Sequence, residues 1–172
     1  MQAACAGDHS AFEELVRRHE TPLYRFLVAR LGHASDAQDV LQEAFAAAWR
    51  YRDSYRPRWR FSTWLYRIAL RHGLRLRDTG GAEHTAQVSL DEVELTAPGS
   101  TDRLEMDIWS FARQHLSSTA FTTVWLHYHE QWKLAEIAAC LGQPVSWVKV
   151  TLHRARKRLA RLLNQRGQRA AL

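Results

Sequence analysis

The sequence predicts an all-α protein with two small helical domains joined by a flexible linker. Apolar residues recur at three- and four-residue intervals along the chain, while the alternating β-branched runs that indicate strands are rare. The 172 residues, 46% of them hydrophobic, are enough for two compact lobes that bury apolar cores. Gly, Pro and acidic residues interrupt the pattern over residues 78–100. We therefore expect one domain over residues 1–77, a linker, and a second domain over residues 101–172.

Residues 1–77 carry the pattern of several amphipathic helices. Apolar residues from Phe12 to His19 share one helical face. Pro22 is expected to open a second helix that Gly32 ends, because Pro suits the first turn of a helix and Gly suits the position after its last.

A third helix is expected to begin at Ser35 or Asp36, whose side chains can cap it. Its apolar stripe consists of Ala37, Val40, Leu41, Ala44, Phe45 and Ala48. Its opposite, polar face consists of Asp36, Asp39, Gln42 and Glu43. After a loop that contains Pro57, Ser62 is expected to cap a fourth helix from Thr63 to about Arg77.

Residues 101–172 predict a bundle of four short helices, expected over residues 102–115, 118–129, 134–141 and about 145–163. The last two form a helix-turn-helix pattern, with Gly142 at positive φ in the turn and Pro144 at the start of the second helix. The side chains expected to face inward are Val145, Val148 and Leu152. Those expected to face outward are Ser146, Trp147, Lys149, Val150, Thr151, Arg154 and Lys157. Such a helix fits the DNA major groove, although an ordinary helical hairpin with a basic end would show the same spacing.

Charge is distributed in three blocks. Residues 48–77 hold nine arginines and one aspartate, residues 78–107 have a net charge of −7, and residues 145–172 hold eight basic residues and no acidic one. Two basic blocks separated by an acidic one indicate two polyanion-binding surfaces on separate domains, because cationic proteins gain affinity for nucleic acid by releasing its counterions. Solvated helix faces are the alternative explanation.

Aromatic residues are interleaved with the arginines of the first basic block. They are Trp49, Tyr51, Tyr55, Trp59, Phe61, Trp64 and Tyr66. Rings stack on unpaired bases for about 1 to 3 kcal/mol per base, so this combination favours single-stranded nucleic acid. The residues assigned to a core by their helical spacing are Trp49, Trp64, Leu65 and Ile68. The loop residues Trp59, Arg60 and Phe61 are assigned to DNA.

Other classes of site have little support in the sequence. Cys5 and Cys140 lack CxxC spacing, and His127 and His129 point about 200° apart on a helix, so we expect neither a metal site nor a cofactor. No stretch approaches the roughly 20 apolar residues of a membrane span, and no signal peptide is evident, so we expect a cytoplasmic protein without membrane insertion.

The aromatic, arginine-rich block and the helix-turn-helix pattern that follows it in the chain together resemble features of the extracytoplasmic-function (ECF) sigma factors. These are RNA polymerase sigma factors with regions 2 and 4 only. The likeness runs from Ala11 to Leu163. AFEELVRRHETPLYRFL is similar to the family's opening helices, DAQDVLQEAFAAAWR to its region 2.2, FSTWLYRIA to its region 2.3, and LAEIAACLG with VKVTLHRARKRL to its region 4. Trp147, Val150 and Thr151 replace the commoner Thr, Ser and Arg, and Leu70, Arg71 and Arg75 replace the usual Arg-Asn and later Asp.

The resemblance implies a transcription initiation factor whose first domain opens the −10 element and whose second domain binds the −35 element. The implied contacts with the β′ coiled coil of core RNA polymerase are Asp36, Asp39, Gln42 and Glu43. The implied −10 contacts are Arg56, Arg58, Trp59, Arg60, Phe61, Ser62, Arg67, Arg71 and Arg75. The implied −35 contacts are Ser146, Trp147, Lys149, Val150, Thr151, Arg154 and Lys157. Further implied partners are the polymerase β flap and an anti-sigma factor.

Two alternative functions differ from this one in class. A protein that mimics a sigma factor and sequesters an anti-sigma factor would not bind DNA, yet it would have no need of a strongly basic surface on both domains. An enzyme is disfavoured because the sequence shows neither a paired nucleophile and base nor a metal-ligand spacing.

Overall fold

The computed structural model of the chain describes the backbone of residues 1–79 and 100–170, and the side chains of residues 1, 3–73 and 108–166. All of the secondary structure in these residues is helical, as predicted. The chain divides into two compact units, Met1–Pro98 and Gly99–Leu172. Most of the predicted linker lies outside the described residues. None of the described helices is long and apolar enough to cross a membrane.

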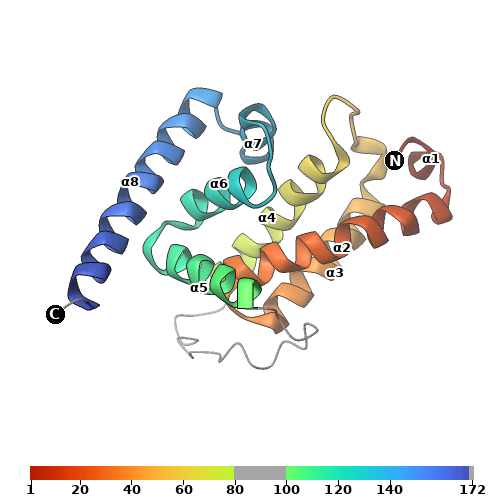
Figure 1. Cartoon of the computed structure of the whole chain (residues 1–172). Coiled ribbons are helices and arrows are strands. Elements are labelled where there is room, and N and C mark those ends of the chain that lie inside the picture. Colours follow the sequence, from red (N-terminus) through yellow and green to blue (C-terminus); the bar gives the residue numbers. More distant parts are fainter. Residues whose placement is uncertain (80–99, 171–172) are drawn as a thin grey trace. The chain divides into compact units, whose positions relative to one another are not determined.

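The first unit is built around helix α3. Its elements are α1 (Gln2–Cys5), α2 (His9–Leu31), α3 (Ala34–Arg50), the 3₁₀ turn η1 (Arg52–Ser54) and α4 (Phe61–Thr79). Helix α3 packs against both α2 and α4 (Figure 1). Its buried side chains are mostly alanines, which allow the neighbouring helices to approach closely. The core also includes Phe26 of α2 stacked on Tyr66 of α4, with ring centroids 5.2 Å apart.

The prediction that Pro22 begins a new helix is wrong. Pro22 lies inside one continuous helix of 23 residues. Proline removes one backbone donor, but the apolar face continues past it, and Leu23, Phe26 and Leu27 are all buried. Burial of this face maintains the helix across the missing hydrogen bond. The helix ends where predicted, at Gly32, whose φ of 87° is readily adopted only by glycine.

Two predicted helix starts are also shifted. Helix α3 has His33 as its N-cap, without a side-chain hydrogen bond, instead of Ser35 or Asp36. Helix α4 begins at Phe61, ahead of the predicted cap at Ser62. The unpredicted cap is Asp8, whose carboxylate accepts hydrogen bonds from the Ser10 hydroxyl and the Ala11 amide at the start of α2. These bonds hold the pKa of Asp8 below its usual value.

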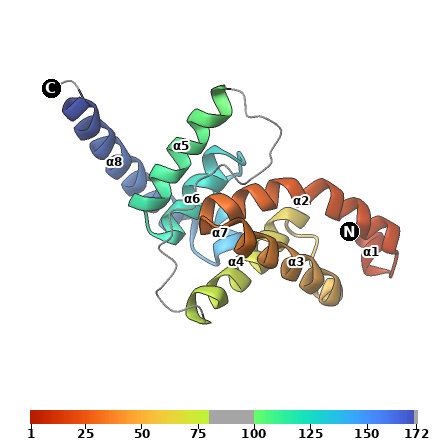
Figure 2. The same cartoon turned by 90° about the horizontal axis from the view of Figure 1, so that it is seen from below.

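The second unit consists of α5 (Ser100–His115), α6 (Ser118–Tyr128), α7 (Leu134–Leu141) and α8 (Val145–Ala170). Helices α6, α7 and α8 pack against one another, and α5 packs against α6. Their core includes Phe121, Leu126, Ile137 and Val148, all fully buried. Helix α7 has its predicted bounds, whereas α8 continues beyond Leu163, so that its last turns extend past α6 and α7 (Figure 2).

Candidate nucleic-acid and protein-binding surfaces

The loop between η1 and α4 is shaped by hydrogen bonds to its own backbone. The Tyr55 hydroxyl donates to the carbonyl of Trp59 over 2.8 Å. Arg56 Nη1 donates to the carbonyl of Asp53 over 3.1 Å. The Tyr55 hydroxyl is a protonated donor at neutral pH, and burial raises its pKa further above the ordinary tyrosine value. Side-chain hydrogen bonds to the backbone therefore occur near both ends of residues 55–60, hereafter the basic loop.

The basic loop presents most of its predicted DNA contacts to solvent. Arg56, Arg58 and Arg60 are exposed and Trp59 is half-buried. The Arg58 guanidinium carbon lies 5.7 Å from the centroid of the Trp59 ring, a cation–π distance. This arrangement combines positive charge with an accessible ring, the two features that single-stranded nucleic acid requires.

Phe61 corrects the assignment of the whole segment to DNA, because its side chain is only 7% exposed. Its ring packs on His19 of α2 at a centroid distance of 5.2 Å, on Trp64 at 6.0 Å and on Tyr55 at 6.4 Å. Phe61 is the first residue of α4, and its ring is directed into the domain. The Phe61 ring packs against Tyr55 of the basic loop and offers no ring face to a base.

Helix α4 continues the positive surface away from the loop. Ser62 is half-buried, and Arg67 and Arg71 are exposed one helical turn apart on the same face. Arg75 belongs to the same helix, but its side chain lies outside the described residues. Two exposed arginines are therefore placed along α4 in addition to the three of the basic loop.

A contact at the N-terminus, absent from the sequence predictions, also supports the basic loop. The Cys5 thiol of α1 donates to the carbonyl of Arg52 over 3.2 Å. Arg52 Nη1 donates to the Trp49 carbonyl over 3.0 Å, and the guanidinium carbon lies 4.3 Å from the centroid of the Trp49 ring. Since η1 leads directly into Tyr55, α1 anchors one end of the loop.

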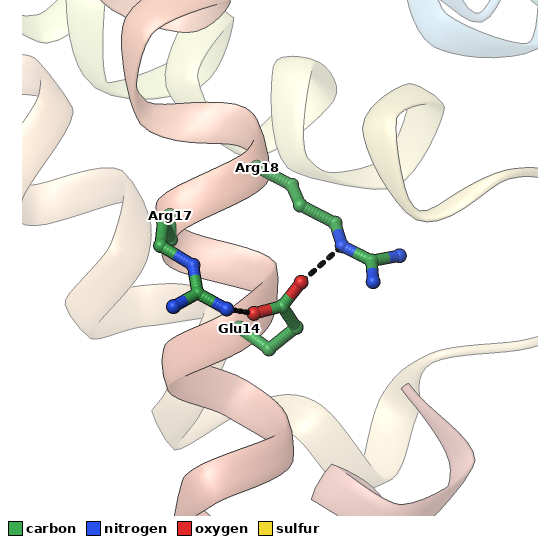
Figure 3. A network of polar contacts seen from close by, with 3 residues as sticks. All are labelled: Glu14, Arg17 and Arg18. Atoms are coloured by element: carbon green, nitrogen blue, oxygen red, sulfur yellow. Dashed lines mark hydrogen bonds and ion pairs between the residues drawn. The ribbon is translucent and has the colours of Figure 1, made fainter.

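One acidic residue pairs with two of the arginines of α2. Glu14 forms ion pairs with both Arg17 and Arg18 on the outer surface of that helix (Figure 3). Arg56 in the basic loop instead donates hydrogen bonds to the backbone carbonyls of Asp53 and Tyr55. Carbonyl acceptors orient a guanidinium without forming an ion pair with it.

The exposed face of α3 is polar. Its four predicted polymerase contacts, Asp36, Asp39, Gln42 and Glu43, are all exposed. They lie opposite the buried stripe that includes Val40, Ala44 and Ala48. This face is free of core contacts and can be used by a partner.

The second unit contains the predicted helix-turn-helix. Gly142 ends α7 at a φ of 65°, and the Gln143 amide donates to the Ala138 carbonyl over 3.0 Å to close the turn. The Glu136 carboxylate accepts from the Lys133 amide over 2.8 Å and caps the start of α7. The bond from Gln143 closes the turn that leads from α7 into α8, whereas the bond to Glu136 stabilises the first turn of α7.

Helix α8 has a buried and an exposed side. Val148, Leu152 and Ala155 are buried. The exposed predicted −35 contacts are Ser146, Lys149, Val150, Arg154 and Lys157, while Trp147 and Thr151 are half-buried. Val145 was expected to face inward but is 39% exposed. It is the first residue of α8, where the turn from α7 leaves it beyond the end of the core.

The histidines singled out in the sequence take part in ring contacts. His129 stacks on Trp125 at a centroid distance of 4.1 Å, and the His127 ring lies 4.7 Å from that of Tyr128. Among the residues that the structure describes, no three His, Cys, Asp or Glu side chains are grouped in a way that could hold a metal ion.

Comparison with known proteins gives matches over both units. The Sigma-70 region 2 family matches residues 15–78, and the Sigma-70 region 4 family matches residues 112–159. The ECF RNA polymerase sigma factor SigM of Mycobacterium tuberculosis is 32% identical, over 95% of this chain and 82% of that protein. The ECF RNA polymerase sigma factor SigW of Bacillus subtilis is 29% identical, over 91% of each. The structure of CnrH in complex with the cytosolic domain of CnrY is similar with a TM-score of 0.73 and 27% identity, over 95% of this chain and 94% of CnrH.

Proposed function

Because this chain belongs to the sigma-70 family and is an RNA polymerase sigma factor of the ECF group, we propose that its two units divide promoter recognition between them. The first opens the −10 element with the basic loop and α4, and the second reads the −35 element with α8. The observation that carries this proposal is the exposure of polar and basic side chains along α8, directly opposite its buried side.

Helix α8 would lie in the major groove of the −35 element. The side chains of its first turns, around Ser146 and Val150, would meet base edges. Arg154 and Lys157 follow on the same side toward the C-terminus, where they would meet phosphates. The second unit would also rest on the β flap of the polymerase.

The basic loop would capture a base of the non-template strand of the −10 element. Trp59 offers a ring for stacking, and Arg56, Arg58 and Arg60 offer charge to the neighbouring phosphates. Unpaired bases gain these contacts and duplex DNA does not, so binding energy shifts the −10 element toward the open form. The mechanism needs no catalytic group, and we propose that the protein is not an enzyme.

The polar face of α3 would dock on the coiled coil of the polymerase β′ subunit. Asp36, Asp39, Gln42 and Glu43 supply three carboxylates and one amide along one exposed helix face. Such a face suits a basic partner surface.

An anti-sigma factor is the further partner that we propose. CnrH, which is similar over 95% of this chain, was solved in complex with the cytosolic domain of CnrY. A partner of this kind would keep the sigma factor from the polymerase until a signal releases it.

A promoter-selection experiment tests the proposed division of labour. Reconstituted holoenzyme is mixed with duplexes that are random at the −35 and −10 positions, and the retained DNA is sequenced. We expect two enriched elements, and Lys149→Gln with Arg154→Gln should weaken retention of the −35 element. A matched variant on α2, Arg17→Gln with Arg18→Gln, changes the net charge equally and should leave retention unaltered. Absence of any enrichment at low salt would instead support a mimic that does not bind DNA.

A further inference from the structure

An apolar side chain occupies the middle of the outer face of α8. Val150 is 46% exposed. It is two residues from each of the buried Val148 and Leu152, which places it about 200° around the helix from both. Val150 therefore lies outside the core, and a β-branched residue is not chosen for helix propensity at an exposed position.

The neighbours of Val150 distinguish it from an ordinary exposed apolar residue. Ser146 lies one turn before it and Arg154 one turn after it on the same face, and both are exposed. Ser146 can donate and accept hydrogen bonds, and Arg154 can bind a phosphate or a guanine edge. Val150 is thus an apolar group within a face that is otherwise able to bind DNA through polar contacts.

Thymine is the base whose major-groove edge matches such a group. All four base pairs present hydrogen-bonding atoms in the major groove, but an exposed methyl group is found only at C5 of thymine. Valine makes no hydrogen bond, so against guanine or cytosine it would cover polar atoms without replacing their bonds to water. Against thymine it would bury two apolar surfaces.

We propose that Val150 reads a thymine of the −35 element through its C5 methyl group. The inference rests on the proposed placement of α8 in the −35 major groove. Val150 would then determine base specificity without making a hydrogen bond.

Deoxyuridine scanning tests the inference, because deoxyuridine lacks only the methyl group of thymidine. The −35 element selected by the holoenzyme is synthesised with each thymine, on either strand, replaced singly by deoxyuridine. We expect holoenzyme affinity to fall about fourfold at one or two positions, the loss that corresponds to one buried methylene-sized group. A selected element without thymine, or one whose affinity is unchanged by every replacement, would overturn the inference while leaving α8 as the −35 reader.

A pair of variants assigns the methyl contact to its side chain. Val150→Ser should abolish the difference between thymine and deoxyuridine at that position. Leu163→Ser is the control, since Leu163 is 48% exposed on the same helix but roughly 20 Å further along it, and the difference should persist. Retention of the full difference in Val150→Ser would overturn the inference. Failure to select any −35 element would count against the proposed function itself.

Discussion

Removal of a single oxygen atom tests whether the basic loop is preorganised for its ligand. In Tyr55→Phe the ring contacts with Phe61 and Trp64 are retained, at centroid distances of 6.4 and 5.5 Å in the native protein. The variant loses only the 2.8 Å hydrogen bond from the Tyr55 hydroxyl to the Trp59 carbonyl. Without this bond, the backbone of Trp59 is no longer tied to Tyr55 at the start of the loop.

The size of the effect follows from that hydrogen bond. A partly buried hydrogen bond between neutral groups contributes about 0.5 to 1.5 kcal/mol net. If its role is to hold the loop in the conformation that captures a base, Tyr55→Phe should weaken binding of single-stranded −10 DNA about two- to tenfold. The affinity of the sigma factor for core polymerase should not change, because the polar face of α3 is unaltered.

The assay measures both affinities on the same preparations. Fluorescent single-stranded oligonucleotides of the selected −10 sequence are titrated with holoenzyme, and labelled sigma factor is titrated with core polymerase. Tyr51→Phe, on a side chain that is 56% exposed, is the matched control. Unchanged oligonucleotide affinity in Tyr55→Phe, or an equal loss of polymerase affinity, would refute preorganisation of the loop by Tyr55.

Three further predictions concern other surfaces. Trp59→Ala should weaken open-complex formation with little change in stability. Phe61→Ala should lower the free energy of unfolding by about 3–5 kcal/mol, because the Phe61 ring is buried and the Trp59 ring is only half-buried. Denaturant unfolding and promoter-opening assays measure the two effects separately. Reversing Asp39 and Glu43 to Lys should weaken polymerase binding about tenfold in a titration with core enzyme, since two exposed charges change sign. Asp8→Ala should lower the midpoint of thermal unfolding at neutral pH.

The Asp8 effect should depend on pH in a defined direction. The folded-state pKa of Asp8 is lowered, so its stabilising contribution is present above the usual carboxyl pKa of 3.8 and is lost as the pH falls through the lower folded-state value. The difference between wild type and Asp8→Ala should therefore shrink in strongly acidic buffer.

For the charge reversals of Asp39 and Glu43, Gln38→Lys on α3 is the control. An equal loss of polymerase affinity in Gln38→Lys would indicate a general charge effect.

Helical periodicity predicted much of the fold, and its failures have physical causes. The bounds of α7, the helix end at Gly32 and the positive φ of Gly142 follow from local rules and were predicted correctly. Pro22 was misread because the local cost of proline is smaller than the gain from the apolar face that runs across it. Val145 was misread because periodicity gives the direction of a side chain but not where the core ends.

Some parts of the candidate binding surfaces could be predicted from the sequence and others could not. Phe61 was assigned to DNA from its aromatic neighbours, although Phe61 and Leu65 are one turn apart and periodicity would have placed both in the core. The Cys5 contact with Arg52 joins residues 47 positions apart, and no local pattern predicts it. The polar face of α3, in contrast, is the complement of an apolar stripe whose predicted members are buried, except Phe45, which is half-buried.

Permanganate footprinting of holoenzyme on a selected promoter tests most directly whether the two units perform separate steps. Wild type should make −10 thymines reactive. A loop variant with Arg56, Arg58 and Arg60 changed to Gln should still protect the −35 element but leave the −10 thymines unreactive. Loss of −35 protection in the loop variant, or undiminished −10 reactivity, would contradict the assignment of promoter opening to the first unit and of anchoring to the second.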